Sequence, residues 1–252
     1  MVRFSQLLLF VLLCTQVAGC KNAENYAREG VKHLNKGEDV TALYFFEKAL
    51  QADEDYALAL YGKGRLLLQN KITKNDGKAM VERALPRLEN PAIKEKAYLI
   101  IAEFYNKEAN TSKAIEYLEN ALKEKIISPK TLGKLALYYS KAGDNKKALE
   151  LLGRSTKEFA QDPSAHADMG RFYFEELKNF ELARQSYLKS HQLQSGQKEI
   201  LYKLMRSSYL VKKPAQSLQY LDMLLKLSID PVETAQLQSL KPLIEKNQWK
   251  LN

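Results

Sequence analysis

Small and large apolar residues recur at helical spacing along most of the chain. In the stretch Lys113–Leu122, Ala114, Leu118 and Ala121 fall on one helical face, and Glu116 falls outside it. The two alanines let a neighbouring helix approach closely, while the larger leucine fills the space between them. The pattern predicts one helix of a helical hairpin at this place.

The same pattern recurs at a period of roughly 34 residues. It returns at 41–50 and 147–152, and in less regular form at 182–187 and 216–221. A helical unit that recurs at this period is typical of a tetratricopeptide-repeat (TPR) array, and the sequence resembles that family. The resemblance implies an all-α TPR superhelix, or α-solenoid, of about six helical hairpins with a C-terminal capping helix.

The residues that match the family pattern also indicate where each repeat begins and ends. The first unit supplies its aromatic, glycine and alanine positions with Tyr26, Gly30, His33, Gly37, Ala42, Phe46 and Ala49. We expect a TPR array over 23–231, with units at about 23–56, 57–94, 95–128, 129–162, 163–197 and 198–231, and a C-terminal helix and tail at 232–252. Pro86 and Pro91 are expected to shorten or kink the second helix of the second unit. Because 11 glycines and 7 prolines are too few for a long flexible linker, no second domain is expected.

The N-terminal residues read as an export signal. One positive charge precedes an apolar run at 7–13, which is too short to cross roughly 30 Å of hydrocarbon. The tetrad Val17-Ala18-Gly19-Cys20 resembles the bacterial lipobox. That resemblance implies a lipoprotein signal peptide at 1–19 and a lipidated N-terminus at 20–22, with the acyl chains on Cys20. Ordinary signal cleavage, which would leave a free cysteine, is the alternative.

The lipobox resemblance implies a lipid-anchored protein of the bacterial cell envelope. Lys21, and not aspartate, follows the cysteine, which by similarity to enterobacterial sorting favours the outer membrane, facing the periplasm. Cys14 would leave with the signal, so no thiol would remain to form a disulfide. The exported chain would then depend on its apolar core for stability.

The chain is basic, with a formal net charge of +9. This balance favours contact with acidic proteins, lipid headgroups or cell-wall polymers. The positive charges are interspersed with carboxylates, however, as on a solvated helix face, and no basic and aromatic recognition motif stands out. We therefore expect no nucleic-acid partner.

Sequence motifs for catalysis or metal binding are missing. None of His33, His166 and His191 stands four residues from a second histidine, as the ligands of a zinc-binding helix do. The first two occupy places where the repeat has an aromatic, which favours packing over metal binding. Gly62-Lys63-Gly64 lacks the rest of a phosphate loop and is better explained by tight helix packing. No nucleophile elbow is present, and the carboxylates lie on predicted solvent faces without a pocket. We expect no enzyme, cofactor, metal or small-molecule substrate.

The most favoured function is that of a membrane-anchored scaffold that binds a protein partner. Exported TPR lipoproteins of this size resemble factors that assemble envelope machines, and the type IV pilus pilotin, which escorts a secretin, is the favoured member. The alternatives within that group are partners of outer-membrane protein insertion and adaptors for cell-wall enzymes. An envelope enzyme or cell-wall-polymer-binding module with a concealed site is the alternative from another class.

The resemblance also implies a concave groove that binds the partner protein or peptide. Family positions on the first helix of each unit select seven residues for the groove: Tyr61, Arg65, Arg171, Phe174, Tyr202, Arg206 and Tyr209. Tyrosine and arginine often carry binding energy at interfaces. Ala27 and Val31 stand where the family's carboxylate clamp would be, so we expect an extended or helical partner segment with aromatic and acidic residues. Alternatively, several of these aromatics fill gaps between units.

Overall fold

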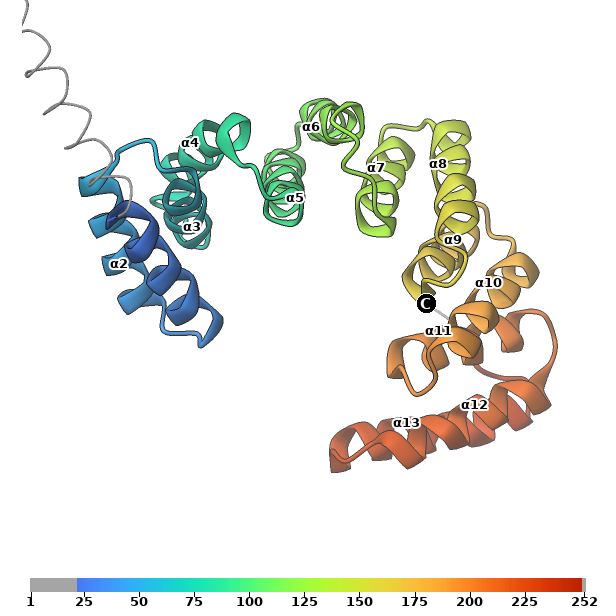
Figure 1. Cartoon of the computed structure of the whole chain (residues 1–252). Helices are drawn as coiled ribbons and strands as arrows, with labels where there is room; N and C mark the ends of the chain where they lie inside the picture. Colours follow the sequence, from blue (N-terminus) through green and yellow to red (C-terminus); the bar gives the residue numbers. More distant parts are fainter. Residues whose placement is uncertain (1–21, 251–252) are drawn as a thin grey trace, which may run out of the picture. The chain divides into compact units, whose positions relative to one another are not determined.

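The computed structural model describes residues 22–250, and every regular element in that range is a helix (Figure 1). A first helix covers 22–35. It is followed by α2 (Asp39–Ala52), α3 (Ala57–Leu67), α4 (Lys74–Ala84), the 3-10 helix η1 (Leu85–Arg87), α5 (Pro91–Lys107), α6 (Thr111–Lys123), α7 (Pro129–Lys141), α8 (Asn145–Glu158), α9 (Pro163–Glu175), α10 (Phe180–Leu193), α11 (Lys198–Leu210), α12 (Pro214–Leu227) and α13 (Pro231–Glu245). The predicted all-α class is confirmed. The predicted signal peptide and Cys20 lie outside the described residues.

The described chain divides between Ile126 and Ile127 into two compact units. The first contains the helices up to α6, and the second contains α7 to α13. The sequence did not indicate this division, because neither glycine nor proline clusters near it. The scarcity of those residues argues against a long linker, but it does not require one continuous compact unit.

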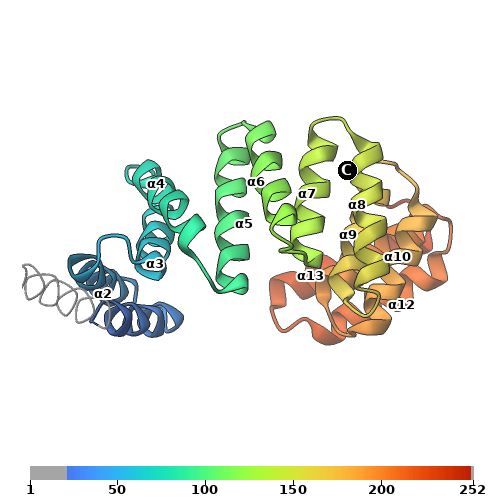
Figure 2. The same ribbon diagram turned by 45° about the horizontal axis from the view of Figure 1, so that its top comes forward.

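Within each unit, consecutive helices pack in pairs. Figure 2 shows α5 beside α6 and α7 beside α8, as the contacts between these pairs require. Ala114, Leu118 and Ala121 are all fully buried, so the face predicted from their spacing is the packed face of α6. Ala148 and Leu152 are likewise buried, on the matching face of α8.

Proline and short polar residues set where several helices begin. Pro163 is the first residue of α9, and the Asp162 carboxylate accepts a hydrogen bond from the backbone N–H of Ser164 at 2.8 Å. Pro86 lies in η1, directly after α4 ends, as expected for a residue that stops a helix. Pro91, however, opens α5, so the unit boundary expected at 94 lies inside that helix. Pro91 therefore does not shorten the helix before it.

Close packing in the first unit depends on glycine beside one large ring. A Cβ on Gly30 would lie 2.6 Å from the Phe46 ring, and a Cβ on Gly62 would lie 2.3 Å from it. Both distances are too short for any side chain, so the two glycines make room for this aromatic ring. The interpretation of Gly62 as a packing residue is confirmed.

Candidate functional site

Two of the seven predicted groove residues lie in the first unit, on α3. Tyr61 is only 6% exposed, and burial, partly offset by the Arg65 charge, raises the pKa of its hydroxyl above the usual value. Arg65 is half-buried and lines a cavity of about 300 Å³ together with Glu103 and Phe104 of α5. Tyr61 therefore offers little area to a partner, and Arg65 is the more accessible of the two.

The other five predicted residues lie in the second unit, and three of them come together between α9 and α11. The Arg206 guanidinium lies 5.3 Å from the centre of the Phe174 ring and 5.9 Å from that of Tyr202. Both distances are within the range of a cation–π contact. Phe174 is 8% exposed and packs in the core against Phe180, whereas Tyr202 is 38% exposed. Phe174 thus supports the arginine, and Tyr202 faces solvent.

Arg206 is the cation of this surface that lacks an acidic partner. Its Nε is buried without a hydrogen bond, and no ion pair to it occurs within residues 22–250. The two neighbouring cations are paired: Arg171 donates to Asp168 at 2.8 Å, and Lys203 donates to Glu175 at 3.2 Å. The Arg206 side chain is therefore held in place by aromatic rings while its charge remains available.

The chain's own tail covers the last predicted residue, Tyr209. The rings of Tyr209 and Trp249 lie 5.2 Å apart, and the Trp249 backbone N–H donates to the Tyr209 hydroxyl at 2.9 Å. Sequence reasoning missed this contact, although Trp249 is the single tryptophan of the chain. Tyr209 therefore anchors the tail and contributes less surface to a partner than predicted.

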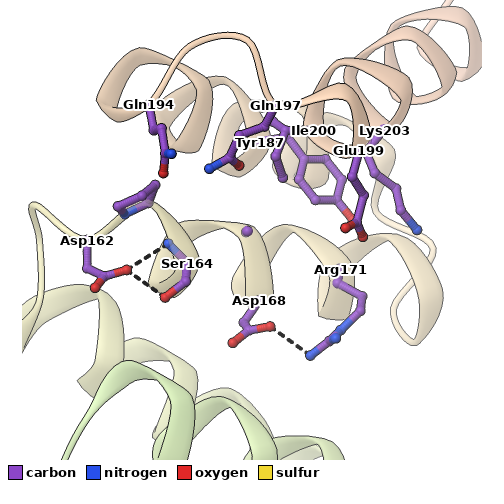
Figure 3. Close-up of a pocket in the computed structure, with 12 residues that line it drawn as sticks. Asp162, Ser164, Asp168, Arg171, Tyr187, Gln194, Gln197, Glu199, Ile200 and Lys203 are labelled. Atoms are coloured by element: carbon purple, nitrogen blue, oxygen red, sulfur yellow. Dashed lines mark hydrogen bonds and ion pairs between the residues drawn. The ribbon is translucent and has the colours of Figure 1, made fainter. Parts of the chain in front are cut away.

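A pocket of about 540 Å³ lies beside this surface, within the second unit. Figure 3 shows Asp162, Ser164, Asp168 and Arg171 on α9 and the turn before it, facing Glu199, Ile200 and Lys203 of α11 and Tyr187 of α10. The sequence placed carboxylates on solvent faces with no pocket. That expectation is wrong for Asp168, which is half-buried and lines this cavity.

Asp168 is held close to α7. A Cβ added to Gly133 would meet the Asp168 Oδ2 at 2.0 Å, so the absence of a side chain at 133 makes room for the carboxylate. Burial raises the pKa of Asp168 above its ordinary value, the Arg171 and Lys134 charges lower it, and the Asp162 and Glu199 carboxylates raise it further. Burial is thus the main cause of the raised pKa, and charges of both signs surround the Asp168 carboxylate.

Tyr187 brings an unsatisfied polar atom to the pocket. The residue is 1% exposed, its ring packs on Gly170, and its hydroxyl has no hydrogen-bond partner within the described chain. Burial, and less strongly the charges of Glu175 and Glu199, raise the pKa of this hydroxyl. It stays protonated and can both donate and accept a hydrogen bond.

Two of the three histidines contact neighbouring parts of their own unit. The His33 ring stacks on Phe45 with 5.2 Å between ring centres, and His166 Nε2 lies 3.0 Å from the carbonyl oxygen of Ala160. Within residues 22–250, no group of three or more His, Cys, Asp or Glu side chains could hold a metal ion. In the same range, no helix combines the length and hydropathy needed to cross a bilayer.

Comparison with known proteins gives matches to solved structures. No protein-family model matches the chain, and no curated protein matches it in sequence. PilF of Pseudomonas aeruginosa is 18% identical, with a TM-score of 0.66 over 88% of this chain and 99% of its own. PilW, described as a widely conserved type IV pilus biogenesis factor, is 16% identical, with a TM-score of 0.67 over 86% of this chain and 97% of its own.

A third structure is YrrB, described as a TPR protein with an unusual peptide-binding site. It is 19% identical, with a TM-score of 0.50 over 77% of this chain and 98% of its own. At these identities the likeness shows the fold alone. The chain has the fold of a tetratricopeptide-repeat protein, in which consecutive helices pack in pairs.

Proposed function

We propose that the protein is a membrane-anchored TPR adaptor of the bacterial cell envelope that holds a protein partner on α9 and α11. The observation that carries this proposal is the unpaired Arg206 guanidinium, which is fixed by Phe174 and flanked by the exposed Tyr202. Arginine and tyrosine supported in this way are the residues that most often dominate interface energies. A carboxylate and an aromatic side chain of the partner complement this surface.

The adaptor is anchored by lipid on Cys20. The ordered tetrad Val17–Cys20 after an apolar run supports this part of the proposal. Each buried methylene contributes about 0.8 kcal/mol, so two or more acyl chains hold a protein on a membrane where one is marginal. A Cys20→Ala protein is expected to lose acyl-chain labelling and to leave the membrane fraction in high salt. Retention of that variant on membranes would exclude the lipid anchor.

The partner belongs to an assembly machine of the outer membrane, facing the periplasm. The likeness to PilF and PilW supports this step, because PilW is described as a pilus biogenesis factor. A pilus or secretin complex is the first candidate, and another outer-membrane complex is the second. Recovery of a partner from envelope extract by the detergent-solubilised full-length protein identifies which of them it is.

Two substitutions test the proposed surface directly. Arg206→Gln removes the free charge, and Tyr202→Ala removes the exposed ring. The matched control is Lys189→Gln, which removes a charge from an exposed position of α10. Phe174 is unsuitable as a probe because truncation of a buried aromatic side chain costs about 3–5 kcal/mol of stability.

Each of the two variants is expected to bind the recovered partner about tenfold more weakly than the wild type, with an unchanged melting temperature. The Lys189 control is expected to bind normally. Equal binding by all four proteins would mean that the partner does not use this face.

A further inference from the structure

Three residues of α11 form a stripe with opposite charges at its two ends. Glu199, Tyr202 and Arg206 stand at positions i, i+3 and i+7, which fall on one face of an α-helix. At a rise of 1.5 Å per residue, about 10.5 Å of helix separates Glu199 from Arg206. The exposed Tyr202 ring lies between the two charges.

The pocket beside the Glu199 end of the stripe suits a cation. Glu199 has neither a hydrogen bond nor an ion pair in the described part of the chain, whereas both cations at the pocket are already paired with carboxylates. The carboxylates of Asp162 and Asp168 line the same cavity (Figure 3). An ammonium or guanidinium group that entered here would meet the unpaired charge of Glu199, whereas Asp168 is already paired with Arg171.

The unpartnered Tyr187 hydroxyl is an independent indication of a ligand group. Buried polar atoms without a partner are rare, because they give up hydrogen bonds to water without replacement. Figure 3 shows the hydroxyl end of the Tyr187 ring directed toward the Glu199 carboxylate, and the Glu199 charge acts on this hydroxyl. An N–H group from a lysine or arginine would donate a hydrogen bond to the Tyr187 oxygen.

We propose that this surface binds a helical segment of the partner that carries one acidic and one basic residue seven positions apart. The inference rests on the proposed function and deepens it. The basic side chain enters the pocket at Glu199 and Tyr187. The acidic side chain pairs with Arg206, and an apolar side chain between them packs on Tyr202.

The spacing selects a helix over an extended strand. Residues seven apart in an α-helix lie on nearly the same face and about 10.5 Å apart, which matches the span from Glu199 to Arg206. In an extended chain this span corresponds to about three residues at roughly 3.3 Å each. Side chains three residues apart in a strand point to opposite faces, so one of the two charges would point away from α11.

The test uses stapled alanine-based helical peptides with fluorescent labels. One peptide carries Glu and Lys seven positions apart with a leucine between them. Others carry two Glu or two Lys at those places, and one has Glu and Lys five positions apart and therefore on different faces. Fluorescence anisotropy measures the affinity of each peptide for the full-length protein in detergent.

The wild type is expected to bind the seven-apart Glu and Lys peptide about tenfold more tightly than the other peptides. Glu199→Lys is expected to prefer the peptide with two Glu, and Arg206→Glu the peptide with two Lys. A switch of preference cannot result from unfolding. The matched controls Asp222→Lys and Lys189→Glu, at exposed positions of α12 and α10, are expected to retain the wild-type preference.

Tyr187→Phe supplies a separate measurement. Because the hydroxyl has no partner within residues 22–250, its removal is expected to leave the melting temperature unchanged or higher. Affinity for the Glu and Lys peptide is expected to fall several-fold, since the lysine loses its acceptor.

Equal affinity for all peptides, absence of binding, or preferences that ignore the substituted charges would overturn the inference. If Arg206→Gln still weakens binding of the envelope partner in that case, the proposed adaptor function is retained. Only the inference that the partner binds as a helical segment with these charges is then rejected.

Discussion

Gly64 of α3 and Gly77 of α4 meet backbone to backbone. A Cβ on Gly64 would lie 2.7 Å from the carbonyl oxygen of Gly77, and a Cβ on Gly77 would lie 2.7 Å from that of Gly64. A Cβ on Gly77 would also lie 2.7 Å from the Leu68 nitrogen. Backbone atoms cannot turn aside as a side chain can, so this crossing requires glycine at both positions.

Gly77→Ala is therefore expected to destabilise the protein. Overpacking of this kind costs about 1–3 kcal/mol, and the better helix propensity of alanine offsets at most about 1 kcal/mol of it. The matched control is Gly153→Ala in α8, where a Cβ would meet nothing within 4 Å. Thermal unfolding is expected to show a lower melting temperature for Gly77→Ala and an equal or higher one for Gly153→Ala. Equal stability of the two variants would contradict the backbone contact.

Ala148→Leu tests the repeated small residue at the helix crossing. Ala148 is fully buried, so the added side chain is expected to cost about 1–3 kcal/mol in urea unfolding. Lys146→Leu introduces the same side chain at an exposed position of α8 and is expected to stay within about 0.5 kcal/mol of the wild type. Lys147 is a poorer control, because its ammonium lies 4.7 Å from the centre of the Tyr139 ring. If Ala148→Leu left the free energy of unfolding unchanged, the helix crossing would have space for a larger side chain.

Glu82 of α4 gives the first unit a pH-dependent contact. Its Oε1 accepts hydrogen bonds from the hydroxyls of Tyr105 at 2.8 Å and Tyr117 at 2.7 Å, and its Oε2 pairs with Lys78 at 3.3 Å. Burial alone would raise the pKa of Glu82, but these hydrogen bonds and the Lys78 charge outweigh it and lower the pKa below the ordinary value. The ionised form is thus favoured by folding, and its contribution is lost as pH falls through the folded pKa.

Glu82→Gln is expected to lower the free energy of unfolding by about 1 kcal/mol at pH 7, allowing for partial exposure of the side chain. The difference from the wild type should shrink as the pH is lowered below the ordinary glutamate pKa of about 4.3, because the wild-type carboxylate gains a proton and becomes uncharged, as glutamine is. Urea titrations at neutral and acidic pH measure both differences. If the difference in the free energy of unfolding stayed constant with pH, the effect of Glu82→Gln would come from altered packing and not from the lost charge.

The sequence predicts which helix faces are buried better than it predicts which side chains are exposed to a partner. Ala114 and Ala148 could be placed because their burial follows from a short-range spacing that recurs along the chain. Phe174 was predicted to face a partner, yet it is buried, because the side chains of α10 and α11 reach over it. A side chain on the outer face of a helix is buried only if side chains of the next repeat are long enough to reach it. The repeat spacing does not specify those lengths.

The pocket illustrates the same limit. Gly133 and Asp168 touch although they belong to different helix pairs, and no local pattern joins them. Trp249 reaches Tyr209 across 40 positions of sequence. Such contacts arise from tertiary packing, so they are visible only once the helices are placed in space.

Photo-crosslinking at position 202 tests the partner-binding face most directly. Tyr202 is replaced by p-benzoylphenylalanine in the full-length protein in its native envelope, with Lys189 replaced in a parallel strain as the exposed control on α10. Binding on α9 and α11 predicts one specific protein adduct at position 202 that disappears when Arg206→Gln is added, and no such adduct at position 189. The same adducts at both positions, or an adduct at 202 that is indifferent to Arg206, would contradict the assignment of this face.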